Sequence, residues 1–208
     1  MKFLSGGKNS FFKVGASNLE LIGGKVILRD NCIEDAWLDY LWRSDEELSK
    51  LDASHPLKMK FDDYLKIYKD QLRRPSSFSR RLSINTISGK YIGNCMYYNM
   101  DSINRQAEVG IVIGDRNYWN RGYGYDALIT LMEYLLAETD LEKLYLHTLV
   151  WNKRAQQAFI KCGFAPIIRV NRNGMDFIKM AIQKRDWQEF CVSKLDFRDS
   201  ASNLQQDP

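Results

Sequence analysis

The sequence has few of the residues that build metal centres and disulfide frameworks. Its four cysteines are far apart and form no Cys-x-x-Cys pair. They are Cys32, Cys95, Cys162 and Cys191. The 2 histidines, His55 and His147, form no His-Glu-x-x-His motif. Zinc ligands usually recur at short spacings, so we expect no metal site. A chain of this length needs no disulfides, and we expect free thiols in a reducing cytoplasm.

Long apolar runs and blocks of one charge are lacking too. No run approaches the ~20 residues that a membrane helix needs, and residues 1–8 lack the apolar core of a signal peptide. The 30 Lys and Arg residues and the 26 Asp and Glu residues give a net charge of +4, with no basic block. Nucleic-acid binders usually concentrate basic residues in a patch. We therefore expect a cytoplasmic protein that binds neither a membrane nor a nucleic acid.

What is present is a regular alternation of strand and helix patterns. The 208 residues, 45% of them hydrophobic, fit one domain with one core. Residues 1–24 are rich in Gly, Ser and Asn, and organised pattern begins at Lys25. Helices are predicted at 33–45, 61–74, 123–137, 152–162 and 186–195, and strands at 25–29, 79–87, 91–99, 108–113, 144–150, 165–171 and 175–183. This order indicates a mixed α/β sheet in a single domain.

One loop, Trp119-Asn120-Arg121-Gly122-Tyr123-Gly124-Tyr125, follows a predicted strand and opens a helix. Glycines let the backbone approach a ligand closely, and the first N–H groups of a helix favour an anion such as a pyrophosphate. A tight strand-to-helix turn is the alternative explanation. The loop lacks the Gly-Lys-Ser/Thr of a nucleotide-binding P-loop and the third glycine of a dinucleotide fingerprint. Nicotinamide chemistry is therefore not expected.

Two further segments, in order along the chain, extend this motif. They are Ala107-Glu108-Val109-Gly110-Ile111-Val112-Ile113-Gly114 and the helix from Asn152 to Gly163-Phe164. With Tyr118–Gly124 between them, the chain resembles the GNAT superfamily of acetyl-CoA-dependent N-acetyltransferases. It looks most like the branch that acetylates ribosomal-protein N-termini and its relatives that act on polyamines, amino acids or aminoglycosides. The resemblance covers residues 25–184, which leaves 1–24 as an N-terminal extension and 185–208 as a C-terminal helix with a flexible tail.

The resemblance implies a GNAT-like α/β fold, with a mixed, mostly antiparallel central sheet and flanking helices. In this family the sheet splays beside the strand that ends near Gly114, and the pantetheine arm of acetyl-CoA lies in the opening. The resemblance places contacts to acetyl-CoA at a set of loop, strand and helix residues. They are Ile111, Val112, Ile113, Arg121, Gly122, Tyr123, Gly124, Tyr125, Asn152, Phe159 and Lys161. For Asn152, a plain helix N-cap is the alternative.

Glu108 is the candidate base that removes a proton from the amine. A free alkyl ammonium has a pKa of ~10.4, so a neutral-pH reaction needs such a group. Strand parity puts Glu108 and Gly110 on one face, and the small Gly110 leaves room for a substrate. The alternative is a solvated carboxylate, or one paired with an arginine. For the acceptor pocket we expect Trp37, Tyr40 and Glu108, with the acidic run at 45–47 favouring a cation.

Phe159 is a departure from the family. Many relatives have a tyrosine there that protonates the departing thiolate, and phenylalanine has no proton to give. A thiol of pKa ~8.5 is a tolerable leaving group, so the loss need not abolish turnover. Solvent, Tyr118, Tyr123 or Tyr145 could substitute, and so could Cys162, for which packing as a small hydrophobe is the alternative. The sequence therefore predicts acetyl transfer to a primary amine, which a small molecule or a protein N-terminus would supply. The alternatives are a catalytically weak acyl-CoA-binding module and a transferase of a longer acyl group. A homodimer is expected only by analogy.

Overall fold

The strands form one sheet, which contains nine strands within the residues described. The computed structural model describes residues 12–14, 19–74, 76 and 78–203, with side chains at 19–74, 76 and 78–193. Across the sheet the strands are β1 (Phe12–Val14), β2 (Leu19–Ile22), β3 (Val26–Asp30), β4 (Arg80–Thr86), β5 (Tyr91–Asp101), β6 (Gln106–Ile113), β7 (Lys143–Leu149), β9 (Met175–Gln183) and β8 (Ala165–Arg172). The helices are α1 (Ala36–Ser44), α2 (Glu46–Leu51), α3 (Phe61–Arg73), α4 (Tyr123–Glu138), α5 (Lys153–Lys161) and α6 (Lys184–Asn203).

The sheet opens between β6 and β7. These two strands run parallel, whereas the other neighbouring pairs of the described sheet are antiparallel. Parallel strands need a crossover connection, which here contains α4. Their ladder pairs only residues 106–108 with 143–145 and ends at the partners Glu108 and Tyr145. Past this point β6 and β7 are unpaired with each other, which confirms the predicted splay.

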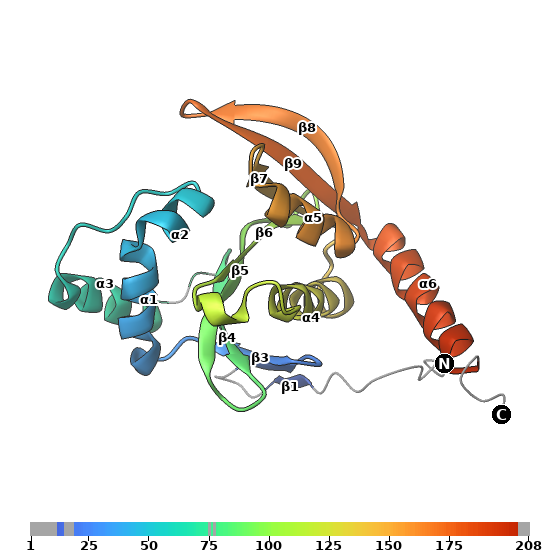
Figure 1. The fold of residues 1–208 in the computed structure, drawn as a ribbon, viewed down its shortest axis with the longest axis horizontal. Helices are drawn as coiled ribbons and strands as arrows, with labels where there is room; N and C mark the ends of the chain where they lie inside the picture. The colour runs from blue at the N-terminus through green and yellow to red at the C-terminus, as the bar shows by residue number, and fades with distance from the viewer. Residues whose placement is uncertain (1–11, 15–18, 75, 77, 204–208) are drawn as a thin grey trace.

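The main core lies where α4 packs on the sheet (Figure 1). Along β6 and β7 the side chains alternate, and Ala107, Val109, Leu144 and Leu146 are buried with the apolar residues of α4. Fully burying one leucine contributes roughly 1.5–3 kcal/mol. The opposite face of β6 carries Glu108, because successive side chains of a strand point to opposite faces. Packing against α4 therefore fixes which face of the sheet presents this carboxylate.

Helices α1, α2 and α3 form a lobe beside the sheet (Figure 1). Polar contacts hold this lobe on β4 and β5. The carboxylate of Asp39 in α1 is ion-paired with Arg81 in β4, and it accepts hydrogen bonds from Tyr64 and from Asn94. Asp39 is only 1% exposed. Breaking a buried pair by removing one partner costs about 3–5 kcal/mol, so this network fixes the position of the lobe.

The structure confirms the predicted fold class: a single α/β domain with a mostly antiparallel sheet and flanking helices. Several boundaries shift by one or two residues, and three larger differences change the organisation of the fold. Organised structure starts before Lys25, because β2 belongs to the sheet and Leu19 and Leu21 are buried in the core. The helix α2 was not expected as a separate element. The last helix runs through Asn203, beyond the predicted 186–195, whereas predictions for 1–11, 15–18 and 204–208 lie outside the described residues.

Candidate active site

A cavity of about 1120 Å³ lies where β6 and β7 part. Its walls come from both strands, the start of α4, one side of α5, the end of α2 and the β8–β9 hairpin. Side chains of both sheet faces reach it because the two strands have no ladder past Glu108. Ligand pockets usually measure ~300–1,000 Å³, so this cavity has room for a large cofactor together with a second substrate.

The start of α4 forms one wall of the cavity. Gly122 is its N-cap residue, with φ of 82°, a left-handed conformation that favours glycine. In the first turn, the Asp126 carboxylate accepts the backbone N–H groups of residues 24–26, which ties the helix start to the β2–β3 turn. First-turn N–H groups have no partner within a helix and carry partial positive charge. The sequence thus builds a rigid site that suits an anion.

Three of the five predicted loop residues line this cavity: Gly122, Gly124 and Tyr125. Arg121 and Tyr123 do not line it. The Arg121 carbonyl oxygen accepts a hydrogen bond from Lys25 Nζ at 2.9 Å, and the Tyr123 ring packs edge-on against Tyr118. Ligand contacts of these two residues stay predictions.

The end of β6 offers the open edge that was predicted to bind pantetheine. Ile111, Val112 and Ile113 all line the cavity. In the described structure no strand pairs with them on the β7 side, so this edge is available to a ligand that binds like an added strand. The Ile113 carbonyl oxygen accepts a hydrogen bond from the Trp119 indole Nε1 at 2.7 Å. This bond holds the loop before α4 close to the end of β6.

Helix α5 brings three predicted residues to the opposite wall. Asn152, Phe159 and Lys161 all line the cavity. Asn152 is a helix N-cap, because its Oδ1 accepts the Ala155 N–H at 3.1 Å. It is also buried in the cavity wall, so the N-cap role and a ligand contact are compatible. Phe159 is 9% exposed and packs edge-on against Phe164.

Glu108 lies at the root of the opening, on the last paired position of β6. Its side chain is 5% exposed and lines the cavity. Oε1 lies 2.6 Å from His147 Nδ1, and Oε2 accepts a hydrogen bond from Asn99 Nδ2 at 3.1 Å. The solvated alternative for Glu108 is therefore wrong, and its direct partner is a histidine rather than an arginine. His147 also lines the cavity, and its side chain is 6% exposed.

A second acidic residue, Asp52, lies at the same end of the cavity, just after α2. It is accessible from the cavity, but the protein around it desolvates the carboxylate and raises the pKa of Asp52 above its usual range. The nearby Tyr98 phenol is partly buried. Desolvation and then the Glu108 charge raise the pKa of Tyr98, so Tyr98 keeps its proton. This end of the cavity therefore presents two carboxylic groups and a phenol.

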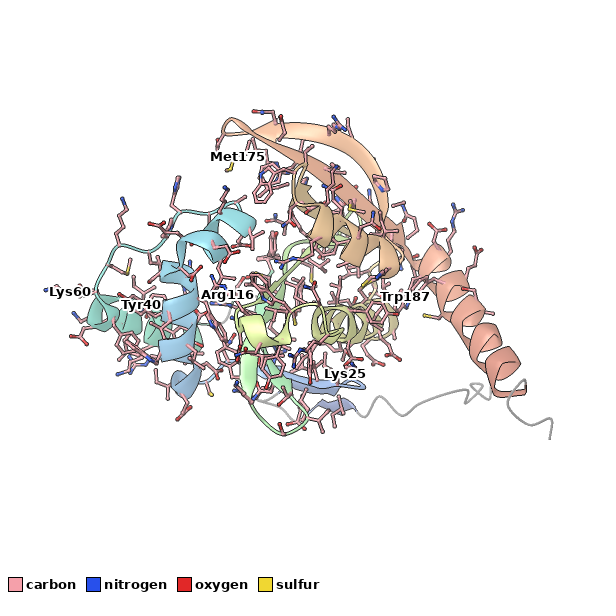
Figure 2. The ribbon with its side chains drawn as sticks, viewed as in Figure 1. Lys25, Tyr40, Lys60, Arg116, Met175 and Trp187 are labelled. Carbon is pink, nitrogen blue, oxygen red and sulfur yellow. The ribbon has the colours of Figure 1, made fainter. Side chains whose placement is uncertain are left out.

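The predicted acceptor residues Trp37 and Tyr40 do not lie at this cavity. They pack with Phe61 inside the α1–α3 lobe, where Trp37 is 50% exposed and the Tyr40 hydroxyl donates to the Met59 carbonyl at 2.9 Å. Figure 2 shows Tyr40 in this lobe. The aromatic side of α1 faces α3, so the structure does not bring these two residues to this cavity, and their role in binding an acceptor stays a prediction. Residues after α2 border the cavity instead.

The acidic run at 45–47 is also largely committed to other contacts. Asp45 caps α2 by accepting the Leu48 N–H at 2.9 Å, and it pairs with Arg116 at 2.8 Å. Hydrogen bonding to Arg116 lowers the pKa of Asp45. Glu47 contacts the same guanidinium at 2.8 Å. None of residues 45–47 lines the main cavity, so Asp52 is the acid that the sequence analysis missed.

The groups named as substitutes for the missing tyrosine acid are placed differently from one another. Tyr118 lines the cavity, and so does the buried Cys162. Tyr123 and Tyr145 do not line it; Tyr145 packs edge-on against His147 instead. Of the three phenols, only Tyr118 is thus in a position to reach a ligand in this cavity.

The described residues hold no group of three or more His, Cys, Asp or Glu side chains that is suited to a metal ion. Among the same residues, no helix is both long enough and apolar enough to cross a membrane.

A sheet that opens beside one strand, with a glycine-bearing helix start at the opening, is the arrangement that the resemblance to N-acetyltransferases predicts. The chain belongs to the GNAT acetyltransferases: the family model "Acetyltransferase (GNAT) domain" matches residues 25–165. No curated protein matches the chain in sequence.

Solved structures support the same fold. A spermidine N-acetyltransferase from Vibrio cholerae, in complex with CoA and spermine, has a TM-score of 0.69 at 20% identity and covers 78% of this chain and 98% of its own. A Bacillus halodurans protein has a TM-score of 0.69 at 18% identity, covering 83% and 93%. A GNAT-family acetyltransferase from Bacillus anthracis has a TM-score of 0.68 at 14% identity, covering 80% and 99%.

Proposed function

We propose that this protein transfers the acetyl group of acetyl-CoA to a primary amine of a small cationic molecule. One observation carries the proposal: the buried carboxylate of Glu108 reaches the same cavity as the anion-binding start of α4 and the unpaired edge of β6. A base, a place for a pyrophosphate and a place for pantetheine are what this reaction requires. Membership of the GNAT family supports the proposal independently.

The residues present fit acetyl-CoA. The pyrophosphate would bind at the backbone amides of residues 121–125, where a side chain in place of Gly122 would crowd the approach and the nearest atom to such a Cβ is Lys25 Nζ at 3.6 Å. The amide groups of pantetheine would bond with the backbone of residues 111–113 and with Asn152. Phe159 and Lys161 would border the arm from α5. The bound thioester supplies an activated carbonyl carbon for attack by an amine.

Glu108 is the proposed base. An amine of pKa ~10.4 is almost wholly protonated at neutral pH, and it must lose a proton to attack. A carboxylate held in the cavity wall would accept this proton directly or through one water molecule. Negative charge that develops on the carbonyl oxygen would be stabilised by a backbone N–H near Val112 or Ile113. The thiol has a pKa of ~8.5 and leaves without a strong acid, so Phe159 does not prevent turnover.

The acceptor class rests on Asp52 and Glu108. Two carboxylic groups at one end of the cavity favour an ammonium group, and a diamine or polyamine would place a second cation near Asp52. The Vibrio cholerae neighbour, by its name, acetylates spermidine, which is consistent with this class. A protein N-terminus, on which the ribosomal-protein branch acts, carries one amine and has less need of a second carboxylate.

The alternative of a weak acyl-CoA-binding module depends on Phe159. Against it stands the buried and doubly hydrogen-bonded Glu108, since a binding module needs no held carboxylate beside the thioester. A thiol-release assay with acetyl-CoA separates the two, using spermidine, a monoamine, an amino acid, an aminoglycoside and a peptide with a free N-terminus. We expect saturable turnover, fastest with the polycation. Tight CoA binding with no thiol release for any amine would contradict the proposal.

A further inference from the structure

The imidazole of His147 bridges Glu108 and Arg172. Its Nδ1 lies 2.6 Å from Glu108 Oε1, and its Nε2 lies 2.9 Å from an Arg172 guanidinium nitrogen. A guanidinium has donors only, so Nε2 must accept this hydrogen bond. The proton of the neutral ring is then on Nδ1, which donates to Glu108. The contact with Arg172 thus determines the tautomer, and the tautomer determines that Glu108 accepts.

We propose that His147 is a positioning residue that holds the Glu108 carboxylate as a hydrogen-bond acceptor at the root of the opening, with Arg172 selecting the tautomer that allows it. The inference rests on the proposed function, in which Glu108 is the base. It adds a role for His147 on β7 and for Arg172 on β8.

The sheet keeps this arrangement in place. His147 is paired with Lys179 of β9 across the antiparallel ladder, although β7 has left β6 at this point. The Tyr145 ring lies edge-on to the imidazole, with centroids 5.9 Å apart. Asn99 holds the other oxygen of Glu108. Glu108 occupies the last position of β6 that is paired with β7, and the side chains of His147 and Asn99 hold its carboxylate where that ladder ends.

The tautomer excludes a different role for the histidine. Because Nδ1 already carries a proton, it cannot take the proton that Glu108 receives from the amine. His147 therefore positions Glu108 and does not relay the proton onward. Ionisable or charged groups face the pair from each neighbouring strand and from the end of α2. They are Tyr98 on β5, Tyr145 on β7, Arg172 on β8, Lys179 on β9 and Asp52.

Two substitutions of His147 test which of its ring nitrogens is needed for activity. The amide nitrogen of asparagine lies close to the position of Nδ1, so His147→Asn retains a donor to Glu108. The longer His147→Gln puts its amide near the position of Nε2 and loses that donor. Hydrogen-bonding partners that hold the ligands of a metal contribute about 10–100-fold to activity, and we expect an effect of the same size here. In His147→Gln and in His147→Leu, kcat should fall about 10–100-fold while KM for acetyl-CoA stays unchanged. In His147→Asn, kcat should be at least tenfold higher than in His147→Gln. Equal kcat in the Asn and Gln variants would overturn the inference.

A second readout needs no turnover. Nitrogen NMR of the His147 ring should show Nδ1–H with an unprotonated Nε2 in the wild type, and Arg172→Met should allow protonation of Nε2 as the pH falls. An Nε2–H tautomer in the wild type would overturn the inference even if the enzyme is active. If no amine is acetylated although the Nδ1–H tautomer is present, the proposed function is overturned, whereas the hydrogen bonds of His147 with Glu108 and Arg172 are not. Thermal unfolding of each variant checks that the fold is intact.

Discussion

Tyr98 and Glu108 are direct partners across the β5–β6 ladder, and both line the cavity. Burial, and then the charge of Glu108, raises the pKa of Tyr98, so the phenol remains a neutral donor beside an anionic acceptor. This pairing puts a hydrogen-bond donor next to a carboxylate that is only 5% exposed. A buried charged group needs such hydrogen-bonding partners.

The base is tested by Glu108→Gln. The glutamine has nearly the same shape but accepts protons poorly, so we expect kcat to fall on the order of 10²–10⁴-fold with CoA affinity unchanged. Raising the pH should restore part of the rate, because more of the amine is then already deprotonated. The measurement is kcat against pH, with calorimetric CoA binding as the control. Wild-type kcat at pH 7 would return Glu108 to a structural role.

The pyrophosphate site is tested by Gly122→Val. We expect at least a tenfold loss of CoA affinity, about 1.4 kcal/mol, because a side chain then stands where the pyrophosphate must approach. Valine also strains a residue whose φ is 82°. Gly89→Val is the matched control: Gly89 has φ of 88° in the β4–β5 turn, with no atom within 4 Å of an added Cβ. Both variants should lose stability, but only Gly122→Val should lose affinity. An equal effect on CoA binding would refute the loop assignment.

The missing phenol is tested by Phe159→Tyr. The added hydroxyl is a general acid of pKa ~10 in the cavity wall. We expect kcat to change by less than about threefold between pH 6 and 9, because a thiolate leaves readily without protonation. A tenfold gain would show that departure of the thiolate limits the rate. A large loss would show instead that Phe159 makes an apolar contact, as a longer acyl group would need.

Asp52→Asn should make the protein more stable but weaken its recognition of the acceptor. Desolvation raises the pKa of Asp52 in the folded protein, so ionising Asp52 disfavours the folded state. This penalty is absent below the unfolded pKa of ~3.9 and develops as the pH rises through the raised folded value. At pH 7 the variant should therefore unfold at a higher denaturant concentration than the wild type, and the difference should vanish below about pH 4.

The same variant should raise KM for a polyamine and leave KM for acetyl-CoA unchanged. Asp62→Asn, an equal charge change on the exposed start of α3, is the control and should alter neither. A variant that is less stable at pH 7, or one with an unchanged polyamine KM, would exclude the role assigned to Asp52.

Local pattern predicted most of the fold. The buried stripe of α4 recurs at helical spacing from Ala127 to Leu136. Between β8 and β9, Asn173-Gly174 adopts φ values of 51° and 77°, the left-handed conformations for which this residue pair is favoured in a hairpin turn. Two elements were too short for periodicity to detect. The strand β2 alternates over only four residues, and α2 has six residues that follow α1 after the single residue Asp45. Within these two elements the apolar residues that the structure buries are Leu19, Leu21 and Leu48, which are too few to form a recognisable period.

For the candidate site, too, local sequence pattern predicted one part and missed another. The start of α4 was predictable because its chemistry lies in one continuous loop. The partners of Glu108 were not, since Asn99, His147 and Arg172 lie on three other strands and meet only through the register of the sheet. The position of Trp37 and Tyr40 away from the cavity has a related reason: the aromatic side of α1 faces α3, and no local pattern shows which neighbour a helix face will contact.

The most direct test is the mass of the acceptor after turnover. The purified protein is incubated with acetyl-CoA and spermidine, beside a parallel reaction with Glu108→Gln. Thiol release and the product mass are followed over the same time course. The account predicts that the polyamine gains the mass of one acetyl group, mole for mole with the CoA released, and much more slowly in the variant. Thiol release without an acetylated amine, or equal rates in both proteins, would contradict it.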